Sequence, residues 1–258
     1  VIGIGRLGGA ARFVGKLGKD ELGTLFETDL KNNDVEPMLF KSSSPTGRVL
    51  SIITPDAQRS MLTCLGAAAE ARADEVSDKW FEGAAIVHIE GYLLFNRELM
   101  LATLNAAKQA GASVSLDLAS FTVVEASKDI LDSLVNDYVD ILITNEDEAS
   151  AFTGCTDERE ALEALSKSAE IAVLKVGSRG SFISYKGDIT KVEAERGGSI
   201  VDTTGAGDLW ASGFLFGLIN GWPPEKCGKL ASSCGYEVCR VVGAKIPEEG
   251  WQRLTVDG

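Results

Sequence analysis

The stretch DTTGAGD, residues 202–208, says more about the fold of this chain than any other segment. It follows a short apolar segment, residues 199–201, which we expect to be a strand, and it opens the apolar run 209–219. That run carries apolar residues on every side of a helix, a pattern typical of a buried helix. The small residues 205–207 therefore lie at the N-terminus of a buried helix, where backbone N–H groups and the helix dipole favour anion binding.

Asp208 lies in the first turn of this predicted helix, where the helix field favours its ionised form. An ionised carboxylate beside an anion site can take a proton from a hydroxyl group that attacks a phosphoryl group. The same residues also fit an ordinary helix cap that follows a glycine turn. The residues alone leave these two interpretations open.

Alternating strands and helices are predicted through the middle of the chain. The expected strands cover residues 85–89, 113–118, 141–144 and 171–176. One helix is expected at 97–110, with Asn96 as its N-cap, and another from Asp157 to about residue 169. Strands that recur at this spacing with helices between them form βαβ units and hence a parallel sheet.

Two segment pairs interrupt this alternation and predict hairpins. Residues 47–54 and 58–65 meet at Pro55-Asp56-Ala57, and residues 182–185 and 189–192 flank Lys186-Gly187-Asp188. Hairpins on a parallel α/β body serve either as edge strands or as a lid over a site, and both interpretations remain open.

Composition limits the class of partner. The length of 258 residues favours one large α/β domain. With 25 Lys+Arg and 38 Asp+Glu, the formal net charge is −13, which argues against nucleic-acid or anionic-membrane partners. A phosphorylated small molecule remains compatible, because it needs only local backbone donors.

No apolar run approaches the length of a membrane span. Five cysteines without CxxC spacing favour a reducing cytoplasm, and Val1 is expected to open an apolar strand.

The segment GIGRLG, residues 3–8, matches the dinucleotide-binding pattern G-x-G-x-x-G. That pattern works only between a strand and a helix, and the glycines that follow at Gly15 and Gly18 leave no room for a helix. Gly9 and Gly15 are also wrongly spaced for a P-loop, and Leu17 follows Lys16 where Ser or Thr is required. Neither nucleotide motif is supported.

The DTTGAGD stretch and the helix after it resemble the C-terminal signature of the PfkB-type carbohydrate kinases, the ribokinase-like family that includes ribokinase, fructokinase and adenosine kinase. Further segments are similar to family motifs in the same order. These are GKLGKDELG at 15–23, NEDE at 145–148, KVGSRG at 175–180 and VGA at 242–244. The resemblance therefore covers most of the chain.

The resemblance implies a ribokinase-like α/β fold over a single domain, residues 1–258. Its mostly parallel central sheet would carry helices on both faces, with a small β-strand lid at about residues 37–65. It implies an ATP- and Mg²⁺-dependent kinase that phosphorylates a hydroxymethyl group of a sugar or nucleoside. An inactive nucleotide- or sugar-binding regulator is the alternative, and the lid could form a homodimer.

The resemblance also assigns roles to residues. Asp208 would be the general base, with Gly205, Ala206 and Gly207 as the anion hole. Asn145, Ser178, Gly180 and Gly243 would contact the nucleotide, together with Gly205 and Gly207. Glu148 would act on Mg²⁺ through water, Asp202 and Thr204 could bind a monovalent cation such as K⁺, and Gly9 would lie at the substrate. His88 is expected in the core, and Asp117 could face the cleft or end a turn.

The N-terminus departs from the family pattern. Gly8-Gly9 stands only six residues before Gly15, where the family carries a whole helix, and no Asn or Asp precedes Asp20. The lid and sugar-site segment is therefore expected to be incomplete in this chain. Residues missing between these motifs explain the spacing better than a true deletion, which would remove a helix and a strand from a marginally stable domain.

Overall fold

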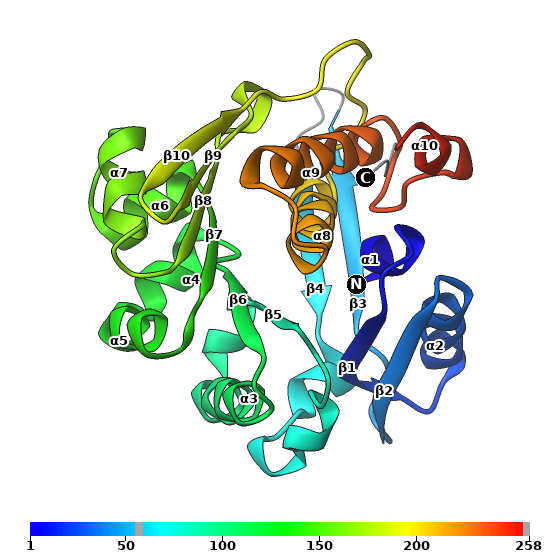
Figure 1. Ribbon diagram of the computed structural model, residues 1–258. Helices are drawn as coiled ribbons and strands as arrows, with labels where there is room; N and C mark the ends of the chain where they lie inside the picture. Colours follow the sequence, from blue (N-terminus) through cyan, green and yellow to red (C-terminus); the bar gives the residue numbers. More distant parts are fainter. Residues whose placement is uncertain (55–58, 255–258) are drawn as a thin grey trace. The chain divides into compact units, whose positions relative to one another are not determined.

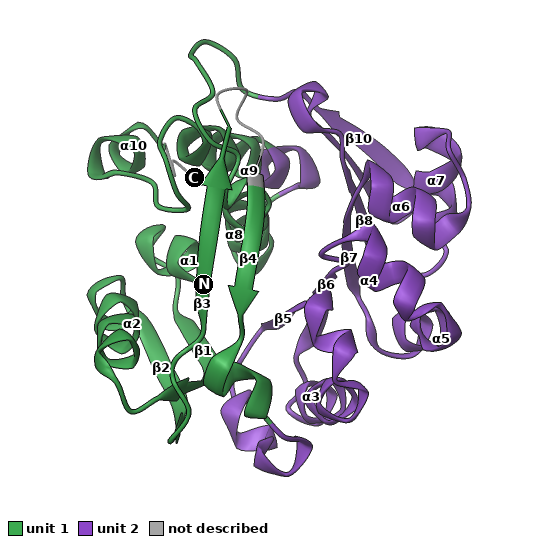
Figure 2. Ribbon diagram, turned by 180° about the vertical axis from the view of Figure 1, so that it is seen from behind, with its two compact units in different colours: residues 1–71, 195–222, 229–258 green, residues 72–194, 223–228 purple. Residues whose placement is uncertain are grey.

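The structure, a computed structural model, describes residues 1–54 and 59–254 and divides into two compact units (Figures 1 and 2). Unit 1 contains residues 1–71, 195–222 and 229–258, and unit 2 contains residues 72–194 and 223–228. Each unit has its own strands and helices, so the prediction of one domain over residues 1–258 stays a prediction.

Unit 2 is built on a six-stranded sheet in the order β10-β9-β8-β7-β6-β5. Its strands are β5 (Ile86–Glu90), β6 (Ser113–Asp117), β7 (Ile141–Asn145), β8 (Ile171–Lys175), β9 (Ser181–Tyr185) and β10 (Asp188–Val192). Strands β5 to β8 pair in parallel, and the hairpin β9–β10 adds two antiparallel strands at one edge. The predicted parallel strands and the second predicted hairpin are confirmed.

Helices flank this sheet, and Figure 1 shows α4 to α7 along it. They are α3 (Arg97–Gln109), α4 (Phe121–Ala126), α5 (Lys128–Tyr138), α6 (Glu146–Thr153) and α7 (Glu158–Leu165). Leu142 and Ile143 are adjacent on β7 and point to opposite faces, yet both are fully buried. Both faces of the central strands are therefore covered, as a mostly parallel sheet requires.

Two predicted helix starts in unit 2 are confirmed. Asn96 accepts a hydrogen bond from the backbone N–H of Leu99 at 3.2 Å. Asp157 accepts bonds from the N–H groups of Arg159 and Glu160 at 2.9 and 3.0 Å. The second helix ends at Leu165 instead of residue 169, because the Ser166 hydroxyl donates to the Glu163 carbonyl and closes the last turn.

Unit 1 contains a βαβ element and a group of helices. Strands β1 (Ala11–Gly18) and β2 (Val35–Ser42) pair in parallel and are joined by α2 (Glu21–Asn32). The other helices are α1 (Ile2–Arg6), α8 (Ala206–Ile219), α9 (Pro224–Cys239), whose first residues belong to unit 2, and α10 (Glu248–Arg253). Within residues 1–54 and 59–254, no helix has the length and apolarity needed to span a membrane.

Helix α8 is the centre of the unit 1 core, as its all-round apolar sequence predicts. Every residue from Leu209 to Gly217 is buried. The core around it consists of Leu7, Leu209, Phe216, Leu230, Cys234, Val238, Cys239, Ile246 and Leu254. A Cβ on Gly213 would lie 2.9 Å from the Ala231 backbone, so α8 and α9 cross at close range where glycine permits it.

Two predicted strands are wrong. The first residues form α1 instead of a strand, because Gly3 packs against Ser212 of α8 and Gly5 against the Asn33 backbone, contacts that a short helix with small residues can make. Residues 199–201 form no strand either. Val201 donates a single hydrogen bond to the Cys239 carbonyl at 2.8 Å, which anchors the segment without a ladder.

The predicted first hairpin is present in unit 1 as an antiparallel pair, β3 (Arg48–Ile53) and β4 (Arg59–Cys64). Its predicted turn, Pro55-Asp56-Ala57, lies outside the described residues. Residues 37–42 belong to β2, which pairs with β1, so the predicted lid segment that starts at 37 covers two different sheets. Leu50 and Leu62 face each other on this pair and are 61% and 62% exposed.

The base of this hairpin is tied together at both ends. Asp20 accepts hydrogen bonds from the N–H and hydroxyl of Thr46 at 2.8 and 2.5 Å, which lower the pKa of Asp20 to about 2. After β4, the Ala67 N–H donates to the Pro45 carbonyl at 2.8 Å. The Glu70 carboxylate accepts from the hydroxyls of Ser42 and Ser44. The two ends of the hairpin therefore form one closed junction.

Candidate active site

The predicted anion site of unit 1 is a turn that requires glycine. Gly205 is the N-cap of α8, with a φ of +77° in the left-handed region. A Cβ at this position would lie 2.7 Å from the Cβ of Ala244. Both the backbone conformation and the lack of space therefore exclude larger residues. The turn lies directly against the 242–244 segment, which the family resemblance also places at the nucleotide.

The backbone donors of this turn are partly used within the protein. The Ala206 N–H donates to the Thr203 carbonyl at 3.2 Å, and the Leu209 N–H donates to the Gly205 carbonyl at 2.9 Å. Gly207 and Asp208 follow Ala206 in the first turn of α8, where backbone N–H groups point toward the N-terminal end of the helix. Ala206, one of the residues of the predicted hole, uses its N–H internally.

Asp202 holds the turn from inside the fold. Its fully buried carboxylate accepts bonds from the Thr204 N–H at 2.9 Å, the Thr204 hydroxyl at 2.6 Å and the Gly243 N–H at 2.8 Å. These bonds bring three predicted site residues together. They also use the Asp202 side chain internally, so a monovalent cation at Asp202 and Thr204 would be bound by backbone carbonyls.

Asp208, the predicted base, lies at the third position of α8 with an exposed side chain. Gly205 is the N-cap of the helix, and no side-chain cap bond is made there. The Asp208 carbonyl accepts a hydrogen bond from the Ser212 hydroxyl at 2.9 Å, which fixes the backbone at this turn. The carboxylate is thus solvent-accessible at the helix end where the first-turn N–H groups lie.

Gly9, the predicted substrate residue, follows α1 in unit 1. Its N–H donates to the Ile4 carbonyl at 2.9 Å, and a Cβ there would meet Ile4 at 2.8 Å and Phe216 at 3.3 Å. Close packing therefore accounts for glycine at this position, and its contact with substrate stays a prediction.

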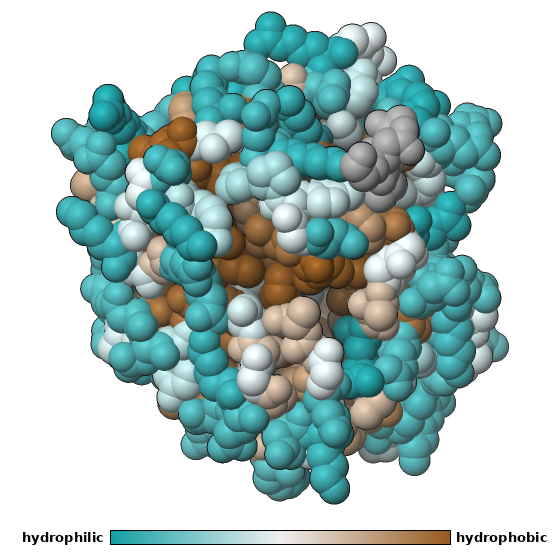
Figure 3. Space-filling model, viewed as in Figure 1, coloured by the Kyte–Doolittle hydropathy of each residue, from teal (hydrophilic) through white to brown (hydrophobic). Residues whose placement is uncertain are grey.

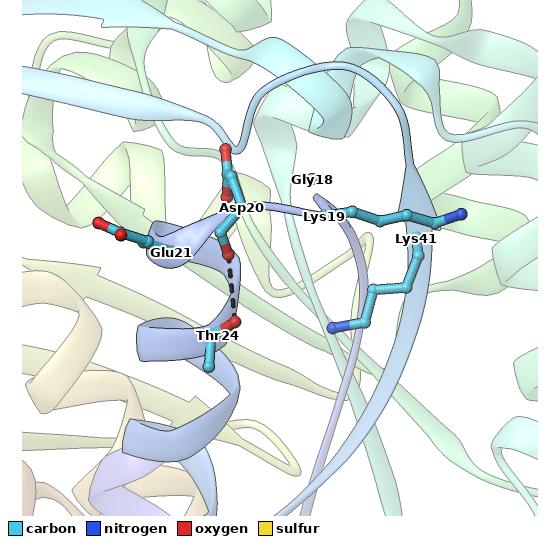
Figure 4. A pocket seen from close by; sticks show the side chains of 6 residues that line it. All are labelled: Gly18, Lys19, Asp20, Glu21, Thr24 and Lys41. Carbon is cyan, nitrogen blue, oxygen red and sulfur yellow. Dashed lines mark hydrogen bonds between the residues drawn. The ribbon is translucent and has the colours of Figure 1, made fainter.

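The N-terminal motif GKLGKDELG forms the junction of β1 and α2. Asp20 caps α2 by accepting from the Gly23 N–H at 2.8 Å, and the Gly18 N–H donates to the Thr46 hydroxyl at 3.0 Å. A hollow of about 680 Å³ lies here, lined by Gly18, Lys19, Asp20, Glu21, Thr24 and Lys41 (Figure 4). Lys41, which lines the hollow, pairs with Glu27 at 2.6 Å. The bonds of Asp20 and Gly18 give the motif a structural role at this junction.

In unit 2, polar side chains end all four parallel strands. Glu90 ends β5, Asp117 ends β6, Asn145 ends β7 and Lys175 ends β8. The register pairs Glu90 with Asp117 and Asn145 with Lys175. The carboxyl ends of parallel strands are where α/β folds bind ligands.

Asn145 and Glu148 form a reciprocal capping box at the start of α6. Glu148 accepts from the Asn145 N–H at 2.8 Å and from its side-chain amide at 2.6 Å, and the Glu148 N–H donates to Asn145 Oδ1 at 2.9 Å. The motif NEDE therefore has a structural role as a helix start. It also holds Glu148 buried, at 2% exposure, next to the strand ends.

Charge is concentrated at this edge. Lys175 Nζ lies 2.7 Å from Asp117 Oδ2. Burial and the Asp117 charge raise the pKa of Glu148 to about 7, although Lys175 acts in the opposite direction. Burial disfavours the charged form of Lys175, but the carboxylates of Asp117, Glu148 and Glu90 outweigh it, so its pKa lies above the ordinary value.

Backbone conformation and packing account for the glycine of the loop at 177–180, with no need of a ligand. Gly180 has a φ of +96°, and a Cβ there would clash with the Val192 carbonyl on β10. Ser178 is exposed in the short turn Gly177–Arg179, and Arg179 forms ion pairs with Glu146 and Glu158. Nucleotide contacts of Ser178 and Gly180 stay predictions.

The sequence left Asp117 undecided and did not single out Lys175 as a site residue. A polar residue lies within one position of the end of each predicted parallel strand, but the ion pair of Lys175 with Asp117 joins residues that are 58 positions apart in the sequence. His88 was expected in the core. It lies half-buried, 3.0 Å from the Ser115 hydroxyl and 3.3 Å from the Glu90 carboxylate, so it belongs to the polar side of β5.

The side-chain oxygen atoms at the strand ends are compatible with a Mg²⁺ ion that is held mainly by phosphate oxygens. Mg²⁺ keeps several waters and takes few protein carboxylates. Among residues 1–54 and 59–254, no three His, Cys, Asp or Glu side chains form a group that could hold a metal. Each Glu148 oxygen accepts one hydrogen bond and retains a lone pair for water, which fits a water-mediated contact.

Comparison with known proteins identifies the family of this chain. The sequence matches the "pfkB family carbohydrate kinase" over residues 1–250. Ribokinase of Arabidopsis thaliana is 29% identical over 247 residues, which cover 90% of this chain and 63% of that protein. The chain thus spans less than two thirds of the length of that relative.

Solved structures share the fold. Adenosine kinase from Sinorhizobium meliloti has a TM-score of 0.91 at 30% identity, covering 97% of this chain and 78% of that one. A putative ribokinase II from E. coli, in complex with ATP and Mg²⁺, has a TM-score of 0.85 at 19% identity, covering 94% and 81%. The expected ribokinase-like α/β fold is confirmed.

Proposed function

Because the chain belongs to the pfkB family of carbohydrate kinases, we propose that it transfers the γ-phosphoryl group of ATP to a hydroxymethyl group of a sugar or nucleoside. The observation that carries this proposal is the 202–208 turn. It presents an exposed carboxylate in the first turn of a 14-residue helix, beside backbone donors suited to a phosphate. The carboxylate and the turn are both intact, which argues against an inactive regulator.

In this proposal Asp208 accepts the proton of the substrate hydroxyl as its oxygen attacks the γ-phosphorus. A new oxygen–phosphorus bond forms, and the bond from the γ-phosphorus to the bridging oxygen of the β-phosphate breaks, which releases ADP. The Gly205 and Gly207 backbone lies where negative charge develops on the transferred group, and dipoles fixed by the fold stabilise that charge without reorganisation.

The nucleotide's metal is assigned to the strand-end cluster. A Mg²⁺ ion that arrives with the nucleotide would supply positive charge that offsets the phosphate charge during transfer. Glu148 would hold one of its waters, and Asn145 would orient the phosphate or that water. A putative ribokinase II from E. coli that shares the fold was solved in complex with ATP and Mg²⁺, which supports the use of ATP and Mg²⁺.

Three further assignments belong to the same proposal. Backbone carbonyls at Asp202 and Thr204 would bind K⁺, since the Asp202 carboxylate is engaged internally. The exposed apolar side chains of β3 and β4 would cover the sugar and could pair with a second copy of the chain. Figure 3, which shows one face of the molecule, has brown apolar areas surrounded by hydrophilic residues. The five cysteines, all in the described part of the chain, form no disulfide bond, which favours a reducing cytoplasm.

An ADP-release screen tests the proposal directly. The protein is incubated with MgATP and adenosine, ribose, fructose or related sugars, with Asp208→Asn as the inactive comparison. Asp132→Asn, an exposed aspartate on α5, is the matched control that leaves the turn unchanged. ADP release that needs an acceptor and is lost only in Asp208→Asn is expected. No acceptor-dependent release with any sugar or nucleoside would overturn the proposed kinase activity.

A further inference from the structure

Glu237 is a buried acidic residue in the last turn of α9, within unit 1. It is only 5% exposed. The C-terminus of a helix carries partial negative charge, which disfavours a carboxylate there, and burial adds a desolvation cost. Both effects oppose an acidic residue at this position, so contacts elsewhere in the fold must compensate for them.

Two arginines from beyond the end of α9 supply these contacts. Arg253 of α10 donates from Nε to Glu237 Oε1 at 2.9 Å and from Nη2 to Oε2 at 2.6 Å, which makes a bidentate pair. Arg240, directly after α9, donates from Nη1 to the same two oxygens at 3.2 and 3.4 Å. These contacts, that of Arg253 above all, hold the pKa of Glu237 below its ordinary value, so the carboxylate is ionised.

Helix α10 can approach this carboxylate because it carries Gly250. A Cβ at Gly250 would lie 3.1 Å from Glu237 Oε2 and 2.6 Å from the side chain of Ile246. Helix α10 therefore lies beside the end of α9 (Figure 1). Glu237, Arg240 and Arg253, which we call the Glu237 clamp, join the two ends of the segment 240–253.

Between the two arginines lies the 242–244 segment, which the family resemblance places at the nucleotide. Gly243 donates its N–H to the Asp202 carboxylate at 2.8 Å. Ala244 leaves no room for a Cβ at Gly205, the N-cap of α8. The segment that the clamp closes is therefore in direct contact with the turn that carries the proposed base.

We infer that Glu237 is a positioning residue for the nucleotide, because its carboxylate closes the segment between Arg240 and Arg253 and keeps Gly243 against the 202–208 turn. The inference rests on the proposed kinase function, which puts the nucleotide at that turn. A buried, bidentate pair holds one geometry, unlike most ion pairs at the surface. Without the Glu237 charge, the nucleotide would have to order this segment on binding, and that ordering lowers affinity.

Nucleotide affinity without turnover tests the inference. A non-hydrolysable ATP analogue is titrated with Mg²⁺ into the protein, and the heat of binding is measured. Glu237→Gln keeps the size of the side chain and removes its charge, and should weaken binding by roughly fivefold or more. Arg253→Lys keeps the charge but loses the bidentate fork, so it should weaken binding less than Arg253→Met, which loses both.

Two control variants separate positioning from stability. Val238→Ala opens space in the unit 1 core one residue away, so it should lower the melting temperature and leave nucleotide affinity unchanged. Glu248→Gln removes the ion pair of α10 with Arg6, which lies outside the clamp, and should also leave affinity unchanged. Because Arg253 is 46% exposed, Arg253→Met keeps the test decisive if Glu237→Gln does not fold.

Kinetics give a second measure of positioning. Glu237→Gln should raise KM for MgATP more than it lowers kcat, with KM for the acceptor unchanged. Losses of nucleotide affinity in Glu237→Gln and Arg253→Met that are no larger than that in Val238→Ala would overturn the inference. Glu237 would then be a structural residue that only joins α10 to α9.

Hydrogen exchange distinguishes failure of the inference from failure of the proposed function. In Glu237→Gln the Gly243 amide should exchange faster than in the wild type, while the amides of α8 keep their rates. Unchanged exchange at Gly243 would overturn the role of the clamp whether or not the protein is a kinase. If the wild type binds no ATP analogue and releases no ADP with any acceptor, the proposed function fails, and the role of Glu237 at the nucleotide fails with it.

Discussion

The 202–208 turn of unit 1 and the strand-end cluster of unit 2 are built in opposite ways. The turn consists of neighbours in sequence, and its binding groups are backbone atoms exposed by Gly205 and Gly207. The cluster takes side chains from the ends of four strands and from the start of α6, and its binding groups are the charges of Asp117 and Lys175 on strands and of Glu148 on α6. A backbone site is recognisable in a short motif, whereas a side-chain site depends on strand register.

The largest expected effect concerns Asp208, the proposed general base of the turn. Asp208→Asn should lower kcat by roughly 10²–10⁴-fold, because a general base is lost while the backbone donors remain. The melting temperature should hardly change, since the side chain is exposed. Parallel measurement of kcat and melting temperature decides this. A variant that keeps more than about a tenth of the wild-type kcat would show that Asp208 is not the base.

The backbone of the turn is tested by Gly205→Ala. The positive φ costs an alanine about 1–2 kcal/mol, and the added Cβ also meets Ala244 at 2.7 Å, so the loss of unfolding free energy should exceed 2 kcal/mol. Gly221→Ala is the matched control, because Gly221 has a φ of +69° but open space around it. Urea unfolding measures both. Equal losses in the two variants would mean that the Ala244 contact does not constrain the turn.

The charge cluster should show itself in the pH dependence of stability. The pKa of Glu148 is about 7 in the folded chain against 4.5 ordinarily, so the folded state holds its proton more tightly. Stability therefore falls as pH rises from about 4.5 to 7, by up to about 3 kcal/mol.

Glu148→Gln should remove this slope, and urea unfolding at several pH values measures it. Glu98→Gln, at an exposed glutamate in the first turn of α3, controls for the loss of a surface charge. A slope that persists in Glu148→Gln would assign the pH dependence to other groups and contradict the raised pKa.

The smallest expected effect is in the lid hairpin. If β3 and β4 cover the substrate, amide hydrogen exchange at 47–54 and 59–65 should slow when sugar and a nucleotide analogue bind together. Mass spectrometry reads this out, with the β9–β10 hairpin as an internal reference. Unchanged exchange at saturating ligand would leave β3 and β4 as a scaffold or a dimer edge.

Local signals predicted most of the fold. The apolar runs that became β5 to β8 and the caps at Asn96 and Asp157 depend on neighbouring residues, and these predictions held. The failures depended on distant contacts. Residues 2–6 form a helix because Gly3 meets Ser212, and residues 199–201 form no strand because Val201 bonds to Cys239 instead of to a partner strand.

The residues of the candidate site also divide into those that local sequence predicts and those that depend on distant contacts. The close association of Asp202, Thr204, Gly205 and Gly243 follows the motif, and one buried carboxylate accounts for most of it. Lys175 and Asp117 are 58 positions apart, and nothing in either local sequence indicates that they pair. Gly180 was assigned to the nucleotide by resemblance, yet its contact with Val192 shows that packing alone requires a glycine there.

The closed junction beneath β3 and β4 has a consequence for how this protein can diversify. Asp20 and Thr46 fix one end of the hairpin, and Glu70 and the Ala67–Pro45 bond fix the other. The described strands β3 and β4 are thus carried on a junction that closes at their base. The pair can change in length and composition while the βαβ element keeps its own hydrogen bonds. If the pair covers the substrate as proposed, exchanging it for that of a relative should transfer substrate specificity.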